Sequence, residues 1–178
     1  IAAADLLGST SVKLAGEGFP PGFFNAATNP GARLLSTGGI CEDAMCGILS
    51  GISMAGHHVG VGSSYAAFLA PLGHITGRLH AIGNQGLREL AGEAGRTMIL
   101  VCAHAGIETG EDGPTHADPQ CLQLLQDNFP RGTLVTLTPW EPQEIPVLLS
   151  AALRRRPAVI AVFVTRPSKE DRKSTRLN

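Results

Sequence analysis

The chain has 178 residues, of which 43% are apolar, and it carries 14 Lys or Arg residues against 15 Asp or Glu residues. This length suits one α/β domain with a real core. The near-neutral charge, with no interleaving of basic and aromatic residues, excludes a nucleic-acid-binding footprint. No apolar run approaches membrane-spanning length and no signal peptide opens the sequence, so we expect neither a membrane segment nor export.

The first 40 residues predict little regular structure. Residues 2–7 form a short apolar strand candidate with Asp5 inside it. Residues 16–33 are rich in Gly, Pro and Asn, which predicts a loop. A weak strand is expected at residues 33–37, where it ends at two consecutive glycines.

The strongest helix prediction covers residues 42–55, because apolar residues recur there near helical spacing and Gly56 marks an end. Residues 57–62 indicate a short strand and turn. Residues 65–82 predict a second helix, which Pro71 interrupts or kinks. The following segment, up to residue 96, is ambiguous between a short helix and a loop.

Strands and helices alternate more clearly in the second half. Strands are expected at residues 97–103, 133–138 and 158–165, and helices at residues 118–128 and 141–155, the last with Ile145, Leu148, Leu149 and Leu153 facing inward. Such alternation predicts a parallel sheet covered on both faces, which is a three-layer α/β/α sandwich.

The four cysteines, at positions 41, 46, 102 and 121, give no sign of a metal site. No pair has Cys-x-x-Cys spacing, and three of the four lie in apolar or helical contexts. This usage is typical of buried reduced thiols in a cytoplasmic protein.

Both ends of the sequence look artificial. The chain starts at Ile1 rather than Met, and residues 171–178 resemble the translation of a common sequencing-adapter oligonucleotide. We set this tail aside as non-native and expect the natural gene to be longer at both ends.

Residues 110–116, Gly-Glu-Asp-Gly-Pro-Thr-His, follow the strand at 97–103 and His104. Open α/β sheets place their sites at the carboxyl ends of strands. Gly and Pro fix the path of this loop, while Asp112 and His116 supply an acceptor and a titratable imidazole. From the residues alone, Asp112 could equally be a turn former that bonds its own backbone.

With these segments in view, residues 2–168 resemble the pyrimidine-binding domain of transketolase, a thiamine-diphosphate enzyme. The most specific motif is His104 through His116. Weaker matches are Asp5 with Ser9, Gly39 through Met45 as Gly-x-x-Glu-x-x-Met, the aromatic pair Tyr65 and Phe68, and Thr165-Arg166 at the end of the domain. The resemblance implies the transketolase reaction of the pentose phosphate pathway, in which a two-carbon ketol unit moves between sugar phosphates.

Glu42 is the catalytic residue that the resemblance implies for the cofactor. Taken alone, it is a first-turn acid that complements the helix dipole, worth a few tenths to about 1 kcal/mol. The resemblance implies a hydrogen bond to the aminopyrimidine ring nitrogen of thiamine diphosphate, which favours the tautomer that removes the thiazolium proton. Tyr65 and Phe68, on one side of a helix start, are implied to line the same pocket, although core packing is a fair alternative. Asp5 is implied to lie near the cofactor, or it is a strand-end cap.

The substrate side follows from the same resemblance. Asp112 and His116 are implied to meet the sugar hydroxyl groups, with His116 in catalytic proton transfer. His104, Ser9 and Arg166 are implied to bind the sugar phosphate, and an Arg fork suits that task. A solvated strand-end residue is the alternative for Arg166. The other histidines, at 57, 58, 74 and 80, are expected to be structural or surface residues.

Some features depart from the family pattern. Cys41 stands where Arg is frequent, and Ala103 and Ala105 flank His104 where Thr and Asp are common. These changes bear on sugar-phosphate specificity more than on cofactor binding. Deoxyxylulose-phosphate synthase and a non-catalytic paralogue are the alternatives; Glu111 favours transketolase, and the retained Glu42 argues against an inactive paralogue.

The family's diphosphate and metal motif, Gly-Asp-Gly, does not occur in this sequence. The resemblance therefore implies that magnesium and the diphosphate group are bound by another domain, contributed by the partner subunit of a homodimer. We expect the isolated chain to be inactive in ketol transfer.

Overall fold

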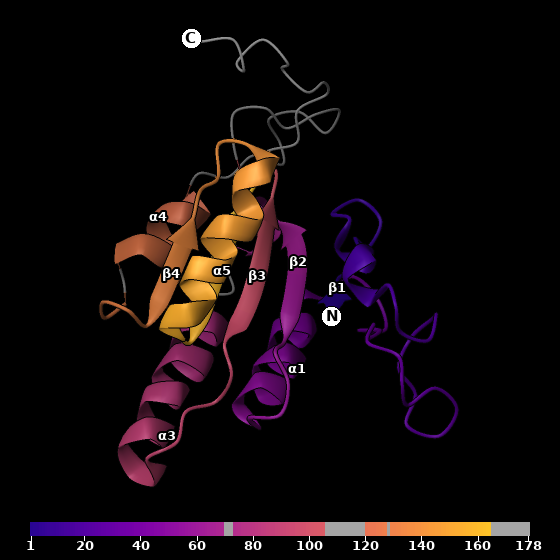
Figure 1. Cartoon of the computed structure of the whole chain (residues 1–178), viewed down its shortest axis with the longest axis horizontal. Coiled ribbons are helices and arrows are strands. Elements are labelled where there is room, and N and C mark those ends of the chain that lie inside the picture. Colours follow the sequence, from indigo (N-terminus) through magenta and orange to yellow (C-terminus); the bar gives the residue numbers. More distant parts are fainter. Residues whose placement is uncertain (70–72, 106–119, 128, 165–178) are drawn as a thin grey trace, which may run out of the picture.

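The computed structural model describes residues 1–69, 73–105, 120–127 and 129–164. Its centre is a five-stranded, all-parallel sheet with the strand order β1-β2-β3-β5-β4 (Figure 1). The strands are β1 (Ala2–Ala3), β2 (Val61–Tyr65), β3 (Met98–Ala103), β4 (Leu134–Leu137) and β5 (Val159–Phe163). Because all strands are parallel, their carboxyl ends lie along one edge of the sheet.

Helices cover both faces of this sheet. On one face, α1 (Glu42–Met54), α2 (Ala66–Leu69), the π-helix η3 (His74–Ile82) and α4 (Gln120–Asp127) share a core with β3 and β5. On the other face, α5 (Ile145–Arg155) packs through Ala152 and Leu149 on Ile160 and Val162. Figure 1 shows α5 crossing in front of the strands, with α1 and α4 behind. The three-layer α/β/α sandwich that the sequence predicts is confirmed.

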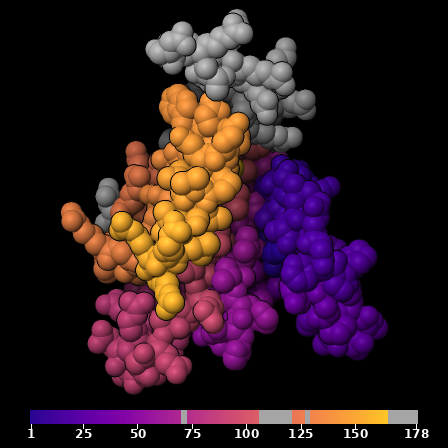
Figure 2. Space-filling view, viewed as in Figure 1, coloured from indigo at the N-terminus to yellow at the C-terminus, as the bar shows by residue number. Residues whose placement is uncertain are grey.

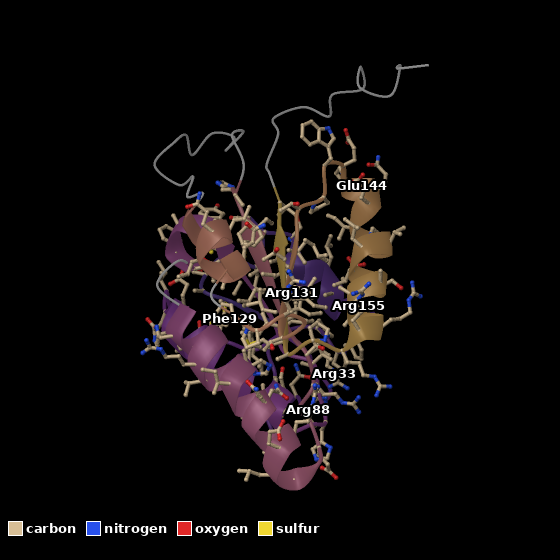
Figure 3. All side chains as sticks on the ribbon, turned by 90° about the vertical axis from the view of Figure 1, so that its left-hand side faces the viewer. Arg33, Arg88, Phe129, Arg131, Glu144 and Arg155 are labelled. Atoms are coloured by element: carbon tan, nitrogen blue, oxygen red, sulfur yellow. The ribbon has the colours of Figure 1, made fainter. Side chains whose placement is uncertain are left out.

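The remaining helices connect these layers. The helix α3 (Gly83–Ala91) continues directly from η3, the 3₁₀ turn η1 (Val12–Gly16) lies in the N-terminal segment, and η5 (Pro142–Glu144) leads into α5. Glu144 and Arg155 lie at opposite ends of α5 (Figure 3), the arrangement that complements a helix dipole. In Figure 2 the indigo N-terminal residues bulge out beside the rest of the molecule, and α5 forms a ridge on the front.

Two interior strands, β3 and β5, supply much of the buried core. Residues in β3 and β5 are almost all buried, as expected for parallel strands with helices on both faces.

Three of the four cysteines, Cys46, Cys102 and Cys121, are buried and reduced, as predicted, whereas Cys41 is exposed. No helix in the described part of the chain is long and apolar enough to cross a membrane.

Several local predictions were wrong. The strand expected at 2–7 is the two-residue β1, and residues 33–37 contribute isolated bridges at Leu34 and Leu35 instead of a strand. The strand expected at 57–62 is β2, which begins at Val61 and runs to Tyr65. Tyr65 therefore ends a strand and does not start a helix, because residues 61–64 already pair with β3.

Two helix predictions also need correction. The helix expected at 65–82 consists of the short α2 and the π-helix η3, since η3 has the wider π-type winding over all of its nine residues. In α5, Leu153 is 37% exposed and does not face inward, whereas Ala152 is buried. The small Ala side chain allows the helix to approach the sheet closely there.

Candidate functional site

The site is built on the carboxyl ends of β2 and β3, which lie side by side. In the strand register Ser64 is opposite Cys102, and Tyr65 is opposite Ala103. His104 follows directly, and the backbone beyond it is tied to the end of β5 by a hydrogen bond from the Ala105 amide to the Val164 carbonyl at 3.2 Å. Two neighbouring strands thus present their terminal side chains at one place.

Glu42 lies at this edge because it is the first residue of α1. The hydroxyl of Ser64 donates a hydrogen bond to its Oε1 atom at 3.0 Å, which joins the start of α1 to the end of β2. Ser64 is completely buried, and Glu42 is half-buried. The carboxylate is therefore held at the rim of the sheet, where a helix N-terminus also favours negative charge.

A stack of rings forms the other part of the site. The ring of Tyr65 lies on that of His104, with centroids 4.0 Å apart and planes 19° from parallel. The ring centroid of Phe68 in α2 lies 5.9 Å from that of Tyr65, and the two ring planes are 28° from parallel. Tyr65 and His104 are buried, whereas Phe68 is 41% exposed. Of these three aromatic side chains, Phe68 is the one that presents a surface to a ligand.

The backbone at two strand ends has an unusual conformation. His104 has a φ of 56° directly after β3, and Asp5 has a φ of 63° shortly after β1. Non-glycine residues rarely adopt this left-handed region, although Asp and His are among those that tolerate it. Such residues cluster at functional sites, and each costs about 1–3 kcal/mol. The conformation of His104 turns its ring onto Tyr65 at the end of the adjacent strand.

Asp5 belongs to a neighbouring hollow. A cavity of about 240 Å³ lies beside the end of β1, and Asp5 lines it together with Ser36, Thr37 and Gly39 from the segment that leads to α1. Glu42 itself does not line this cavity. Ser9 is exposed and does not line this cavity.

Three predicted site residues lie outside the described residues: Asp112, His116 and Arg166. The most specific motif, residues 110–116, lies there too, so the contacts of the sugar-facing loop stay a prediction. The structure brings together Tyr65, Phe68 and His104 at the adjoining ends of β2 and β3, and it bonds Glu42 to Ser64, the residue before Tyr65 in β2.

Two buried thiols lie close to the Glu42–Ser64 pair: Cys46 is one turn from Glu42 in α1, and Cys102 is opposite Ser64 in β3. Burial, together with the nearby carboxylates of Asp43 and Glu42, raises the pKa of Cys46 to about 12. The pKa of Cys102 is raised well above its usual range, mainly by a hydrogen bond with Cys121 and next by burial. These thiols stay protonated at neutral pH, so they add no charge that competes with Glu42.

Sequence reasoning missed Ser64, which the structure places against the predicted catalytic carboxylate. The available signal was a pair of serines in an otherwise small and apolar strand, Val61–Tyr65. Most buried hydroxyls have a hydrogen-bond partner, and the partner of Ser64 is Glu42. His80 is buried, whereas His57, His58 and His74 are exposed, as the prediction of structural or surface roles allows.

The donor set suits the pyrimidine end of thiamine diphosphate. A half-buried carboxylate can bond a ring nitrogen, and an exposed aromatic face can pack on a flat heterocycle. Among the described residues no group of three His, Cys, Asp or Glu side chains is placed to hold a metal ion.

The family model for the transketolase pyrimidine-binding domain matches residues 1–170. The chain belongs to this family. A protein of Methanocaldococcus jannaschii, provisionally named a transketolase C-terminal section, is 33% identical over 123 residues, which are 69% of this chain and 32% of that relative. The aligned part of the chain thus spans about a third of that relative's length. Domains of this family bind thiamine diphosphate.

Proposed function

We propose that this chain is the pyrimidine-binding part of a thiamine-diphosphate-dependent transketolase, which transfers a two-carbon ketol unit between sugar phosphates. One observation carries the proposal: Glu42 begins α1 and is held by the buried hydroxyl of Ser64 in β2, directly before Tyr65 of the stacked rings. The match to the transketolase family over residues 1–170 supports the same reaction class.

In this proposal each described residue has a stated task. Glu42 holds a proton between its carboxylate and the ring nitrogen of the aminopyrimidine. Phe68 packs on the flat ring and excludes water from one side of it. Bound thiamine diphosphate would supply the carbon nucleophile and the electron sink. Tyr65 and His104 form the wall that separates this pocket from the sugar-facing side.

The sugar-facing side combines His104 with residues outside the described part of the chain. Asp112 and His116 are proposed to bind the sugar hydroxyls, with His116 moving a proton, and Ser9 and Arg166 are proposed to bind phosphate. Ala103 and Ala105 remove two polar side chains beside His104, so we expect the preferred sugar phosphates to differ from those of most transketolases.

We further propose that magnesium and the diphosphate group are bound by a separate domain of a partner subunit, in a cytoplasmic homodimer. The support is the sequence, which lacks the Gly-Asp-Gly motif of that domain. The chain also aligns with only 32% of its relative from Methanocaldococcus.

Reconstitution tests this proposal. The purified chain is combined with a transketolase diphosphate-binding domain, thiamine diphosphate, magnesium and a ketose phosphate, and aldose-dependent ketol transfer is measured. We expect turnover from the combination and none from either part alone. Turnover by the isolated chain would contradict the assignment of the missing half, and failure of every combination that binds the cofactor would contradict the proposed reaction.

A further inference from the structure

Two neighbouring serines in β2 differ in their relation to Glu42. Ser63 and Ser64 are both completely buried, and the alternation of a strand points them to opposite faces of the sheet. Ser64 Oγ donates to Glu42 Oε1 at 3.0 Å. Ser63 Oγ has no hydrogen-bond partner among the described residues. The strand therefore contains a serine that bonds Glu42 and a matched serine that bonds no group in the described part of the chain.

We propose that Ser64 is the positioning residue for Glu42. Its hydroxyl holds Oε1 and thereby directs Oε2 to the aminopyrimidine ring nitrogen. The inference rests on the proposed function, because it assigns a partner to the carboxylate that the proposed reaction uses. Within the described part of the chain, Ser64 is the one hydrogen-bond partner of this carboxylate.

Ser64 is well suited to hold another group because it is itself fixed. Its strand is paired on both sides, with β1 through Ser63 and with β3 through Ser64 opposite Cys102. Its side chain has a single rotatable bond before the hydroxyl. Glu42, by contrast, reaches from the first turn of a helix through three side-chain torsions. A rigid donor that bonds a flexible acceptor sets the orientation of the acceptor.

The stoichiometry of the bond decides which oxygen is left for the ligand. A serine hydroxyl has one proton to donate, so it can engage one carboxylate oxygen at a time. A hydrogen bond to a charged acceptor is also shorter and stronger than a neutral one. Replacement of Ser64 by Ala removes the donor and lets the carboxylate of Glu42 rotate toward water.

The experiment compares three variants in the complete enzyme with bound thiamine diphosphate: Ser64→Ala, Ser64→Thr and Ser63→Ala. The first measurement is the rate at which the thiazolium C2 proton of the bound cofactor exchanges with deuterium, followed by NMR after acid quench. The second is the separation of kcat from KM in ketol transfer. Cofactor affinity, from titration of protein fluorescence or heat, is the third.

We expect Ser64→Ala to slow the C2 exchange and kcat by about 10-fold or more, the loss expected for one hydrogen bond to a charged group. Cofactor affinity and KM should change by less than about 3-fold, because the other contacts remain. Ser64→Thr keeps the hydroxyl and should restore most of the rate. Ser63→Ala should resemble the wild type, since it removes a buried hydroxyl that bonds no described group.

The outcomes separate this inference from the proposed function. If Glu42→Gln abolishes C2 exchange while Ser64→Ala exchanges at the wild-type rate, the positioning role is wrong and the proposed function stands. If Glu42→Gln exchanges normally, the proposed function itself fails. If Ser64→Ala does not fold, as judged by circular dichroism, Ser64→Cys decides: a sulfur in this place is a weak donor, and an unimpaired rate would overturn the proposal.

Discussion

Lowering the pH from 7.5 to 5.5 should destabilise the folded chain through His80. This side chain is completely buried, and its Nε2 atom lies 2.9 Å from the Ala158 carbonyl, to which it can donate. Its Nδ1 atom lies 3.1 Å from Ser50 Oγ, and Asn84 Nδ2 lies 3.2 Å from Nε2. The imidazole therefore links α1, α3 and the residue before β5.

The direction of the pH effect on folding stability follows from the direction of the shift in the pKa of His80. Burial lowers the pKa of His80 from its ordinary value of 6.5, and this effect outweighs the hydrogen bond to the Ala158 carbonyl, which acts in the opposite direction. In the unfolded chain the imidazole takes up a proton as the pH falls through 6.5, while the buried imidazole stays neutral. Stability is thus present above pH 6.5 and is lost below it.

The magnitude is bounded by the same linkage. If the buried imidazole stays neutral throughout, protonation of the unfolded state between pH 7.5 and 5.5 costs at most about 1.4 kcal/mol of unfolding free energy. Urea unfolding followed by circular dichroism at both pH values measures it. The variant His80→Gln keeps an N–H donor but cannot titrate, so its pH dependence should be smaller by up to this amount. An exposed histidine, His58→Gln, serves as the control.

An unchanged pH dependence in His80→Gln would refute the reasoning, because the slope would then arise from other groups. Carboxylates that are bonded in the folded state also lose stabilisation in acid, but mainly below this range. For this reason the comparison of the two variants is more informative than the wild-type slope alone.

Two further substitution pairs test the packing. Gly77→Ala in η3 should cost about 1–3 kcal/mol of stability, because the new methyl group would meet the ring of Phe129 (labelled in Figure 3). Gly86→Ala in α3 meets no neighbouring atom and should stabilise the chain by about 0.5–1 kcal/mol. Thermal unfolding that ranks the two variants in the reverse order would contradict this. Tyr65→Ala should cost about 3–5 kcal/mol, because it removes a buried ring that stacks on His104 and leaves a cavity, whereas Tyr65→Phe should cost less than about 1.5 kcal/mol. Equal unfolding midpoints would contradict this.

The sequence predicts best where one physical signal dominates. The helix α1 and the strands β3 and β5 were predicted to within about two residues at each end because their apolar patterns are strong. The strand β2 was placed too early, since Gly62, Ser63 and Ser64 carry no apolar alternation and are buried by their neighbours. Tertiary context, not local propensity, makes these residues a strand.

Residues 33–37 and η3 show two other limits of prediction from the sequence. Residues 33–37 have the composition of a strand but form isolated bridges, because an edge is stabilised by pairing partners that composition does not reveal. Gly77 of η3 lies against the ring of Phe129, which is 52 residues away along the chain. Neither contact has a local signature.

The candidate site divides in the same way. Glu42 could be proposed from the family motif, and its place at the start of a helix could be predicted from the apolar pattern that follows it. The partner of Glu42 could not, because Ser64 lies 22 residues away and meets it only when β2 and α1 come together. The stack of Tyr65 on His104 likewise depends on the strand register.

The central claim is that Glu42 acts on the cofactor and does more than complement the dipole of α1. The neighbouring Asp43 is the matched control, since it is also a first-turn acid, it is exposed, and its ion pair with His74 at 3.5 Å contributes little. The decisive measurement is kcat for ketol transfer in the complete enzyme. We predict that Glu42→Gln lowers it by about 100-fold or more, while Asp43→Asn stays within about 3-fold of the wild type. Equal and small effects of the two substitutions would contradict the account.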